Sequence, residues 1–134
     1  MAESKKILFV CVENAGRSQM AEGFLRKFAL QFDVISAGTN PKSQLIPNVI
    51  DVMKEIGIDI IEQKPKELTN EMIAQSITVN MGCIDKESCP ALFVEDVIDW
   101  NISDPKDKDI EELRKIRDQI KNEVLNLIKK LEDQ

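Results

Sequence analysis

The sequence predicts one α/β domain, built as a doubly wound four-stranded parallel sheet with helices on both faces. Short apolar runs alternate along the chain with segments of helical periodicity, which is the pattern of strand–helix–strand units. The 134 residues match the size of one domain, and 43% of them are hydrophobic, so one core can form. No internal repeat, low-complexity tract or linker divides residues 1–134, so we expect a single domain over that whole range.

Four short apolar runs are the predicted strands. The first is continuously apolar and rich in β-branched residues, as expected of a strand that is buried on both faces. In chain order the predicted strands are Ile7–Val12, Val34–Ala37, Ser76–Met81 and Val97–Trp100.

Two helices are predicted in the first half of the chain. The first runs from Arg17 to about Phe32. It is predicted because Phe24, Phe28 and Phe32 are spaced four residues apart and therefore lie on one face of a helix. A second helix, Pro47–Ile56, has proline in its first turn and is followed by Gly57, which is a common residue just beyond a helix end.

Two more helices are predicted in the second half. Thr69 is a suitable N-cap for a short helix over Asn70–Gln75. The last helix has apolar residues at helical spacing and charges on its other face, which indicates core packing of the apolar stripe. That stripe consists of Ile110, Leu113, Ile116, Ile120, Val124, Leu127, Ile128 and Leu131.

Composition excludes several classes of function. The net charge of −6 argues against nucleic acid or an anionic membrane as a partner. The longest apolar run is far shorter than the ~20 residues of a membrane helix, so we expect a cytoplasmic protein. The odd number of cysteines, three, disfavours a secreted scaffold with every cysteine paired. The absence of histidine excludes His-based general bases and Cys–His pairs.

The segment from Cys11 to Arg17 predicts an oxyanion site. It joins a predicted strand to a predicted helix, and such a loop turns its backbone N–H groups toward one centre at a positive helix end. Gly16 permits close approach of the backbone, and the Arg17 guanidinium can hold two oxygens of a tetrahedral anion. We therefore predict that the substrate is bound by the residues that follow the cysteine: Glu13, Asn14, Ala15, Gly16, Arg17 and Ser18.

The same loop explains how a nucleophile can work without histidine. A helix N-terminus and a nearby cation lower the pKa of a cysteine thiol, so Cys11 is predicted to react as a thiolate. Ser18 can donate a hydrogen bond to the sulfur. The competing interpretation is a buried cysteine at a strand end beside a surface arginine.

The loop resembles that of a known family. The pattern Cys-x5-Arg-Ser on a small α/β domain is similar to the low-molecular-weight protein tyrosine phosphatase fold. The string Cys11-Val-Glu-Asn-Ala-Gly-Arg-Ser-Gln-Met-Ala-Glu-Gly23 resembles the arsenate reductases of that fold. The stretches Ser36-Ala-Gly-Thr39 and Met53-Lys-Glu-Ile-Gly-Ile-Asp59 are also similar, so the resemblance covers nearly the whole chain.

The resemblance implies a general acid at Asp104. In family members the matching Asp-Pro pair stands beside the anion loop, where it can protonate the leaving oxygen. Asp104 and Pro105 follow the fourth predicted strand here. Asp before Pro is also an ordinary turn signal, and Asp99 is a nearby alternative acid.

The resemblance also implies a thiol relay through Cys83 and Cys89, which follow the third predicted strand and therefore lie at the same sheet edge as Cys11. Cys11 attacks arsenate, Cys83 attacks Cys11 and releases arsenite, and Cys89 then forms a Cys83–Cys89 disulfide that thioredoxin reduces. The open alternatives are two inert core cysteines and a metal site, although the three thiols lack a fourth ligand.

Arsenate is the expected substrate, with phosphate and sulfate as competing oxyanions. Relatives that act on phosphotyrosine carry aromatic residues after the Asp-Pro pair, whereas lysine and aspartate follow it here and the chain contains no tyrosine. The alternative functions are a phosphomonoesterase using Cys11, Arg17 and Asp104 alone, and a thiol redox sensor or arsenite-binding module. We expect a monomer.

No cofactor and no metal ion are expected. Some relatives bind potassium through residues that match Asn14, Glu22 and Ser36, together with an acidic residue at the position of Lys66. A lysine at that position disfavours the ion, and the neighbouring Glu67 is the alternative acidic ligand.

The spacing of the relay cysteines makes a testable prediction. In a helix, six steps would separate the Cα atoms of Cys83 and Cys89 by about 9 Å. A disulfide requires roughly 4.4–6.8 Å, so the oxidised segment cannot remain a regular helix. Hydrogen exchange of residues 83–89 should therefore differ between the reduced and oxidised protein, and identical protection in both states would contradict the relay.

Overall fold

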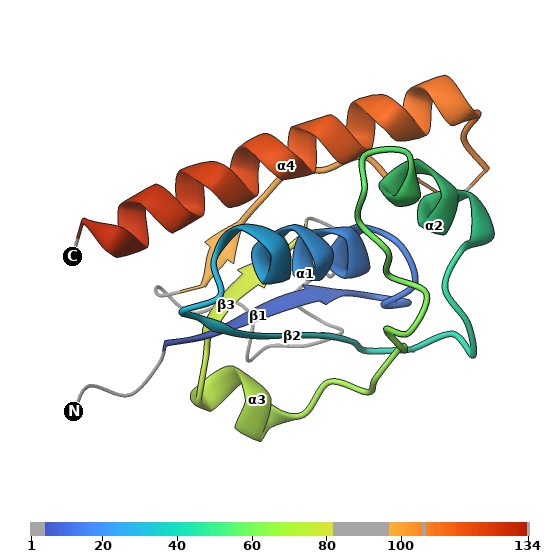
Figure 1. Cartoon of the computed structure of the whole chain (residues 1–134). Helices are drawn as coiled ribbons and strands as arrows, with labels where there is room; N and C mark the ends of the chain where they lie inside the picture. The colour runs from blue at the N-terminus through green and yellow to red at the C-terminus, as the bar shows by residue number, and fades with distance from the viewer. Residues whose placement is uncertain (1–4, 82–96, 106, 134) are drawn as a thin grey trace.

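The sheet has the predicted architecture. A computed structural model of the chain describes residues 5–81, 97–105 and 107–133. Its four strands are parallel and lie in the order β2-β1-β3-β4 (Figure 1). They are β1 Lys6–Cys11, β2 Asp33–Gly38, β3 Ile77–Asn80 and β4 Ile98–Asp99. Because β2 and β3 flank β1 on opposite sides, the strand order reverses at β1, and a ligand is expected at its carboxyl end.

Helices cover both faces of this sheet. The helices α1, α2 and α4 lie on one face, with α4 running across both of the others, and α3 lies on the opposite face (Figure 1). Their bounds are α1 Arg17–Phe28, α2 Pro47–Lys54, α3 Asn70–Ala74 and α4 Ile110–Glu132. Within the described ranges, none of these helices combines the length and apolar character that a membrane span requires.

The predicted elements are all present, and their ends differ by a few residues. The largest difference is in α1, which ends at Phe28 and not at Phe32. Ala29 leaves the helical region with φ −145°, because the chain must reverse before β2 begins at Asp33. Phe32 still packs against the core, so its helical spacing reports burial and not a continued helix.

Other local signals are confirmed. The hydroxyl of Thr69 accepts a hydrogen bond from the backbone N–H of Met72 at 3.2 Å, as an N-cap should. Gly57 follows α2 in the left-handed region, with φ +82°, where a side chain would be strained.

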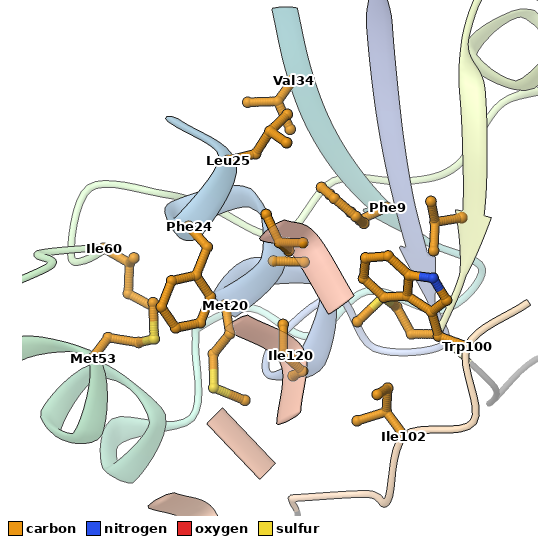
Figure 2. Close-up of a cluster of buried hydrophobic side chains, with 14 of the residues drawn as sticks. Phe9, Met20, Phe24, Leu25, Val34, Met53, Ile60, Trp100, Ile102 and Ile120 are labelled. Atoms are coloured by element: carbon orange, nitrogen blue, oxygen red, sulfur yellow. The ribbon is translucent and has the colours of Figure 1, made fainter. Parts of the chain in front are cut away.

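The larger core lies between the sheet and the three helices on its first face. Phe9 from β1 contacts Trp100 just beyond β4, with ring centroids 5.6 Å apart, and the helices close over them (Figure 2). Seven residues of the predicted apolar stripe on α4 are buried in this core, and the eighth, Ile110, is partly buried. The stripe therefore packs against the domain itself, as predicted.

A smaller core occupies the other face. Leu8 and Val10 of β1 pack there with Ala37 of β2, and α3 covers them with Met72 and Ile73. Because its neighbours Ile7 and Phe9 face the larger core, β1 is buried on both faces, as its continuous apolar run predicted.

A charged cluster joins α2 to α4 at the edge of the larger core. Arg114 donates two hydrogen bonds to the Glu55 carboxylate, at 3.0 and 2.6 Å. Arg117 is buried, and it donates to Glu55 and to the Val52 carbonyl. The hydrogen bond from Arg114, opposed in part by desolvation, lowers the pKa of Glu55 below its ordinary value.

Replacing this carboxylate should reduce stability in a pH-dependent way. The lowered pKa of folded Glu55 stabilises the fold above the pKa of the unfolded chain, and this contribution is lost as pH falls from about 5 through the folded-state pKa. Glu55→Gln should therefore lower the melting temperature at pH 7, and the difference from the parent should shrink in acid. The exposed Glu62→Gln is the control. A difference that stays constant down to pH 3 would contradict this account.

Candidate active site

A pocket opens at the carboxyl end of β1, where the strand order reverses. The loop from Cys11 to Arg17 forms its floor, and two further segments form its walls. Its volume is about 410 Å³. The lining residues are Cys11, Val12, Glu13, Ala15, Gly16, Arg17, Asn40, Lys42, Ile46, Asp104 and Pro105.

The sulfur of Cys11 lies at the start of α1. Cys11 is only 4% exposed, and its sulfur is 2.9 Å from the Ser18 hydroxyl oxygen. The Asn14 side-chain amide donates to that same oxygen at 2.7 Å. The Ser18 proton is then available to the sulfur when Cys11 is a thiolate. This hydrogen bond and the positive end of α1 both favour the charged form.

Asn14 holds the loop in a conformation that most residues avoid. Its φ is +51°, in the left-handed region that asparagine tolerates better than other non-glycine residues. Its side-chain oxygen accepts a hydrogen bond from the Lys66 backbone N–H at 2.8 Å, and its carbonyl accepts one from the Gln19 side chain at 2.9 Å. Gln63 in turn donates to Gln19. Asn14 therefore connects the loop to residues 63–66.

Two glycines allow three segments to converge on the sulfur. A Cβ atom on Gly38, at the end of β2, would lie 2.4 Å from the Val12 carbonyl oxygen. A Cβ atom on Gly16 would lie 2.8 Å from the Pro105 ring. Glycine at these positions lets β2 and the segment around Pro105 approach the loop closely.

Arg17 and Asp104 form one wall of the pocket. Arg17 is buried along most of its side chain, and one terminal nitrogen, Nη1, donates to the Ile102 carbonyl at 2.8 Å. Its other terminal nitrogen, Nη2, is 4.0 Å from a carboxylate oxygen of Asp104. Asp104 is exposed and lines the pocket, whereas the alternative acid, Asp99, lies within β4 and is not among the lining residues. The position of Asp104 suits proton donation to a bound anion.

The structure brings most of the predicted site residues together. Six of them line the pocket directly: Cys11, Glu13, Ala15, Gly16, Arg17 and Asp104. The side chains of Asn14 and Ser18 are fully buried, and Asn14 donates to the Ser18 hydroxyl that contacts the Cys11 sulfur, so only their backbone N–H groups can meet an anion in the pocket. Cys83 and Cys89 lie outside the described residues.

Two parts of the pocket wall were not foreseen. Asn40 and Lys42 follow β2, and Ile46 directly precedes α2. For Asn40 and Lys42, the available signal was their position shortly after a strand that neighbours β1, because parallel strands end at the same sheet edge. Glu13 lines the pocket, and its carboxylate is 3.5 Å from the Lys42 ammonium.

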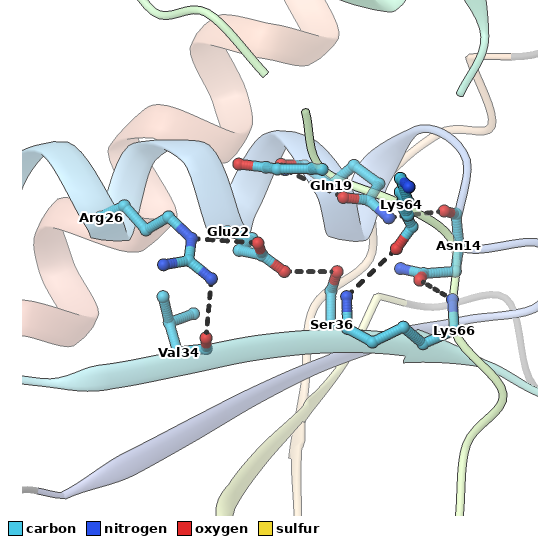
Figure 3. A network of polar contacts seen from close by, with 9 residues as sticks. Asn14, Gln19, Glu22, Arg26, Val34, Ser36, Lys64 and Lys66 are labelled. Atoms are coloured by element: carbon cyan, nitrogen blue, oxygen red, sulfur yellow. Dashed lines mark hydrogen bonds and ion pairs between the residues drawn. The ribbon is translucent and has the colours of Figure 1, made fainter. Parts of the chain in front are cut away.

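The residues that match the potassium ligands of relatives do not fit a cation here. Both oxygens of the buried Glu22 carboxylate are engaged, one by the Ser36 hydroxyl at 2.8 Å and the other by Arg26 at 3.0 Å (Figure 3). The Asn14 oxygen already accepts the Lys66 N–H. Arg26 supplies the positive charge that neutralises Glu22, so an added cation would have to displace existing donors.

The fold and the pocket together define the class of protein. The family model for low molecular weight phosphotyrosine protein phosphatase matches residues 6–134, and the chain belongs to that family.

Curated relatives are named as arsenate reductases. A putative arsenate reductase of Halobacterium salinarum is 36% identical, over 91% of this chain and 89% of the relative. A glutaredoxin arsenate reductase of Synechocystis is 37% identical, over 95% of this chain and 98% of the relative. An arsenate reductase of Staphylococcus aureus is 36% identical, over 91% of this chain and 95% of the relative.

Solved structures agree with the fold. An arsenate reductase in a phosphate-binding state has a TM-score of 0.83 and 34% identity, over 94% of this chain and 98% of that chain. A thioredoxin-dependent arsenate reductase of Corynebacterium glutamicum has a TM-score of 0.80 and 32% identity, over 98% of this chain and 63% of that chain.

The hydrogen bond to the sulfur makes a prediction about the thiol. Ser18→Ala removes the donor nearest to the Cys11 sulfur, so the pKa of Cys11 should rise by about one unit. The measurement is the pH dependence of iodoacetamide alkylation, read on the Cys11 peptide by mass spectrometry. Ser43→Ala, an exposed serine, is the control. An unchanged alkylation profile in Ser18→Ala would show that Ser18 does not stabilise the thiolate.

Proposed function

We propose that the protein reduces arsenate to arsenite through three cysteines and is recycled by thioredoxin. One observation carries the proposal: the Cys11 sulfur lies at the floor of the pocket, hydrogen-bonded to Ser18, with Arg17 and Asp104 on one wall. Relatives at about 36% identity that carry the name arsenate reductase support the choice of substrate.

The loop suits a tetrahedral oxyanion. Backbone N–H groups at the start of α1 and the partial positive charge of that helix end favour an anion above Cys11. Arg17 has five donors, and its contact with Ile102 occupies one of them, so others remain to hold substrate oxygens.

In the first step the Cys11 thiolate attacks arsenic(V), and an As–S bond forms while one As–O bond breaks. The departing oxygen requires a proton, and we assign its donation to Asp104, which lines the pocket, so that water leaves. Arsenic keeps its oxidation state in this step. The product is an arsenate ester of the Cys11 sulfur.

Reduction follows when the Cys83 thiolate attacks the Cys11 sulfur. An S–S bond forms, and the electron pair of the S–As bond passes to arsenic, which leaves as arsenite. Cys89 then attacks Cys83, which frees Cys11 and leaves a Cys83–Cys89 disulfide. Two electrons thus move from two thiols to one arsenic, and an external dithiol restores the thiols.

The pocket wall favours a small inorganic anion over an aryl phosphate. Its apolar contributions come from Val12, Ala15, Ile46 and Pro105, and no aromatic side chain is among the described lining residues. A phosphotyrosine ring would therefore lack the stacking partners that aromatic recognition uses.

We assign thioredoxin as the electron donor. Thioredoxin fits a chain with three cysteines, and one structural relative is named as thioredoxin-dependent. Another relative is named as a glutaredoxin arsenate reductase. Parallel turnover assays with a thioredoxin system and a glutathione–glutaredoxin system distinguish the two donors. Faster turnover with glutaredoxin would overturn the thioredoxin assignment alone.

The relay predicts different failures for two cysteine variants. Cys83→Ser should release no arsenite, even in a single turnover without reductant, because the thiol that attacks Cys11 in the relay is missing. Cys89→Ser should release about one equivalent per protein and then stop, because the Cys11–Cys83 disulfide is not resolved. Arsenite is quantified after a rapid quench.

A phosphatase substrate supplies the control. Any slow hydrolysis of p-nitrophenyl phosphate should survive in Cys83→Ser and Cys89→Ser but disappear in Cys11→Ser. Parental arsenate turnover by Cys83→Ser would contradict the relay. Phosphatase activity with no arsenate turnover in the parent would favour a phosphomonoesterase. Arsenite retained by the protein without turnover would favour a binding module.

A further inference from the structure

We propose that Lys42 captures the oxyanion at the mouth of the pocket and that Glu13 opposes it as an internal competing anion. The pair thereby sets the affinity of the site for oxyanions. This inference rests on the proposed function for the identity of the natural anion, but it concerns any tetrahedral oxyanion. Lys42 would be a specificity-determining residue outside the loop that holds the nucleophile.

Backbone hydrogen bonds fix Lys42 beside the loop. The N–H of Asn40 donates to the Val12 carbonyl at 2.8 Å, and the N–H of Lys42 donates to the Glu13 carbonyl at 3.0 Å. The N–H of Ile46 donates to the Ala15 carbonyl at 3.0 Å. Residues 40–46 are therefore hydrogen-bonded alongside residues 12–15. These bonds hold the backbone of Lys42 at the pocket.

The ion pair between Lys42 and Glu13 can separate easily. The Lys42 ammonium is 3.5 Å from the Glu13 carboxylate, and their side chains are 55% and 29% exposed. An ion pair with this exposure is only weakly favourable, because water screens both charges. A bound anion with two negative charges can therefore compete with Glu13 for Lys42 at little cost.

The balance of charge shows why this pair matters. Two pairs of opposite charge frame the pocket, Arg17 with Asp104 and Lys42 with Glu13, and each pair sums to zero. With Asp104 ionised, before it takes up the proton that it donates in the reaction, a Cys11 thiolate then leaves the site with a net charge of −1. Without Lys42 the net charge would be −2, and without the Glu13 carboxylate it would be zero.

Opposite effects on anion binding follow from this balance. Lys42→Gln should weaken the binding of inorganic phosphate by about threefold to tenfold, the size expected of one partly screened charge near a bound anion. Glu13→Gln should tighten it by a smaller factor, because that carboxylate is already partly neutralised by Lys42. The double variant should bind close to the parental affinity, since both charges of one neutral pair are removed.

Phosphate titrations of the reduced, full-length protein test the proposal. Binding is followed by amide chemical shifts of the loop, at low and at high salt. The difference between Lys42→Gln and the parent should shrink at high salt. Lys130→Gln removes the same charge from the exposed last turn of α4 and is the matched control. Melting temperatures of all variants verify that the fold is retained, which separates an electrostatic effect from a structural one.

Four outcomes decide between the inference and the proposed function. Equal phosphate affinity in Lys42→Gln, Lys130→Gln and the parent would overturn the inference, as would weaker binding by Glu13→Gln. The predicted opposite shifts, together with a failure to reduce arsenate, would overturn the proposed function and leave the inference standing. Absence of saturable phosphate binding by a parent that reduces arsenate would overturn the inference alone.

Discussion

The site depends on one chain of hydrogen bonds that runs from the Lys66 backbone to the Cys11 sulfur. Lys66 holds the Asn14 side chain, Asn14 donates to Ser18, and Ser18 contacts the sulfur at 2.9 Å. This chain fixes the left-handed backbone of Asn14, which the loop needs in order to curl around an anion. Because it begins about fifty residues from the cysteine, the reactivity of Cys11 is a property of the whole fold.

Close backbone approach is the second constraint, and it determines which charges meet. Glycine at the end of β2 lets residues 40–46 lie against the loop, and glycine at position 16 does the same for Pro105. Each of these two approaches brings one charged residue to the pocket, Lys42 from the first and Asp104 from the second. An acidic protein thus builds a local site for an anion from backbone dipoles and two neutralised ion pairs.

The sequence predicted the parallel sheet, the helices on both faces and the loop, because each depends on local periodicity or on a short motif. It did not predict what depends on the packing of the folded chain. The spacing of Phe32 continued a helical pattern, yet the turn into β2 ended the helix at Phe28. Asn14 and Ser18 belong to the predicted motif, but the burial of their side chains depends on tertiary packing that no motif encodes. Lys42 carries no motif and became visible only through its hydrogen bond to the loop.

The most direct test of the account is a single turnover with arsenate in the absence of any reductant, followed by quantification of arsenite and of free thiols. If Cys11 is the nucleophile of a reductive relay, each protein should release one arsenite and lose two of its three thiols. Peptide mapping should then find a Cys83–Cys89 disulfide and a free Cys11. Retention of all three thiols with no arsenite released would contradict the central claim.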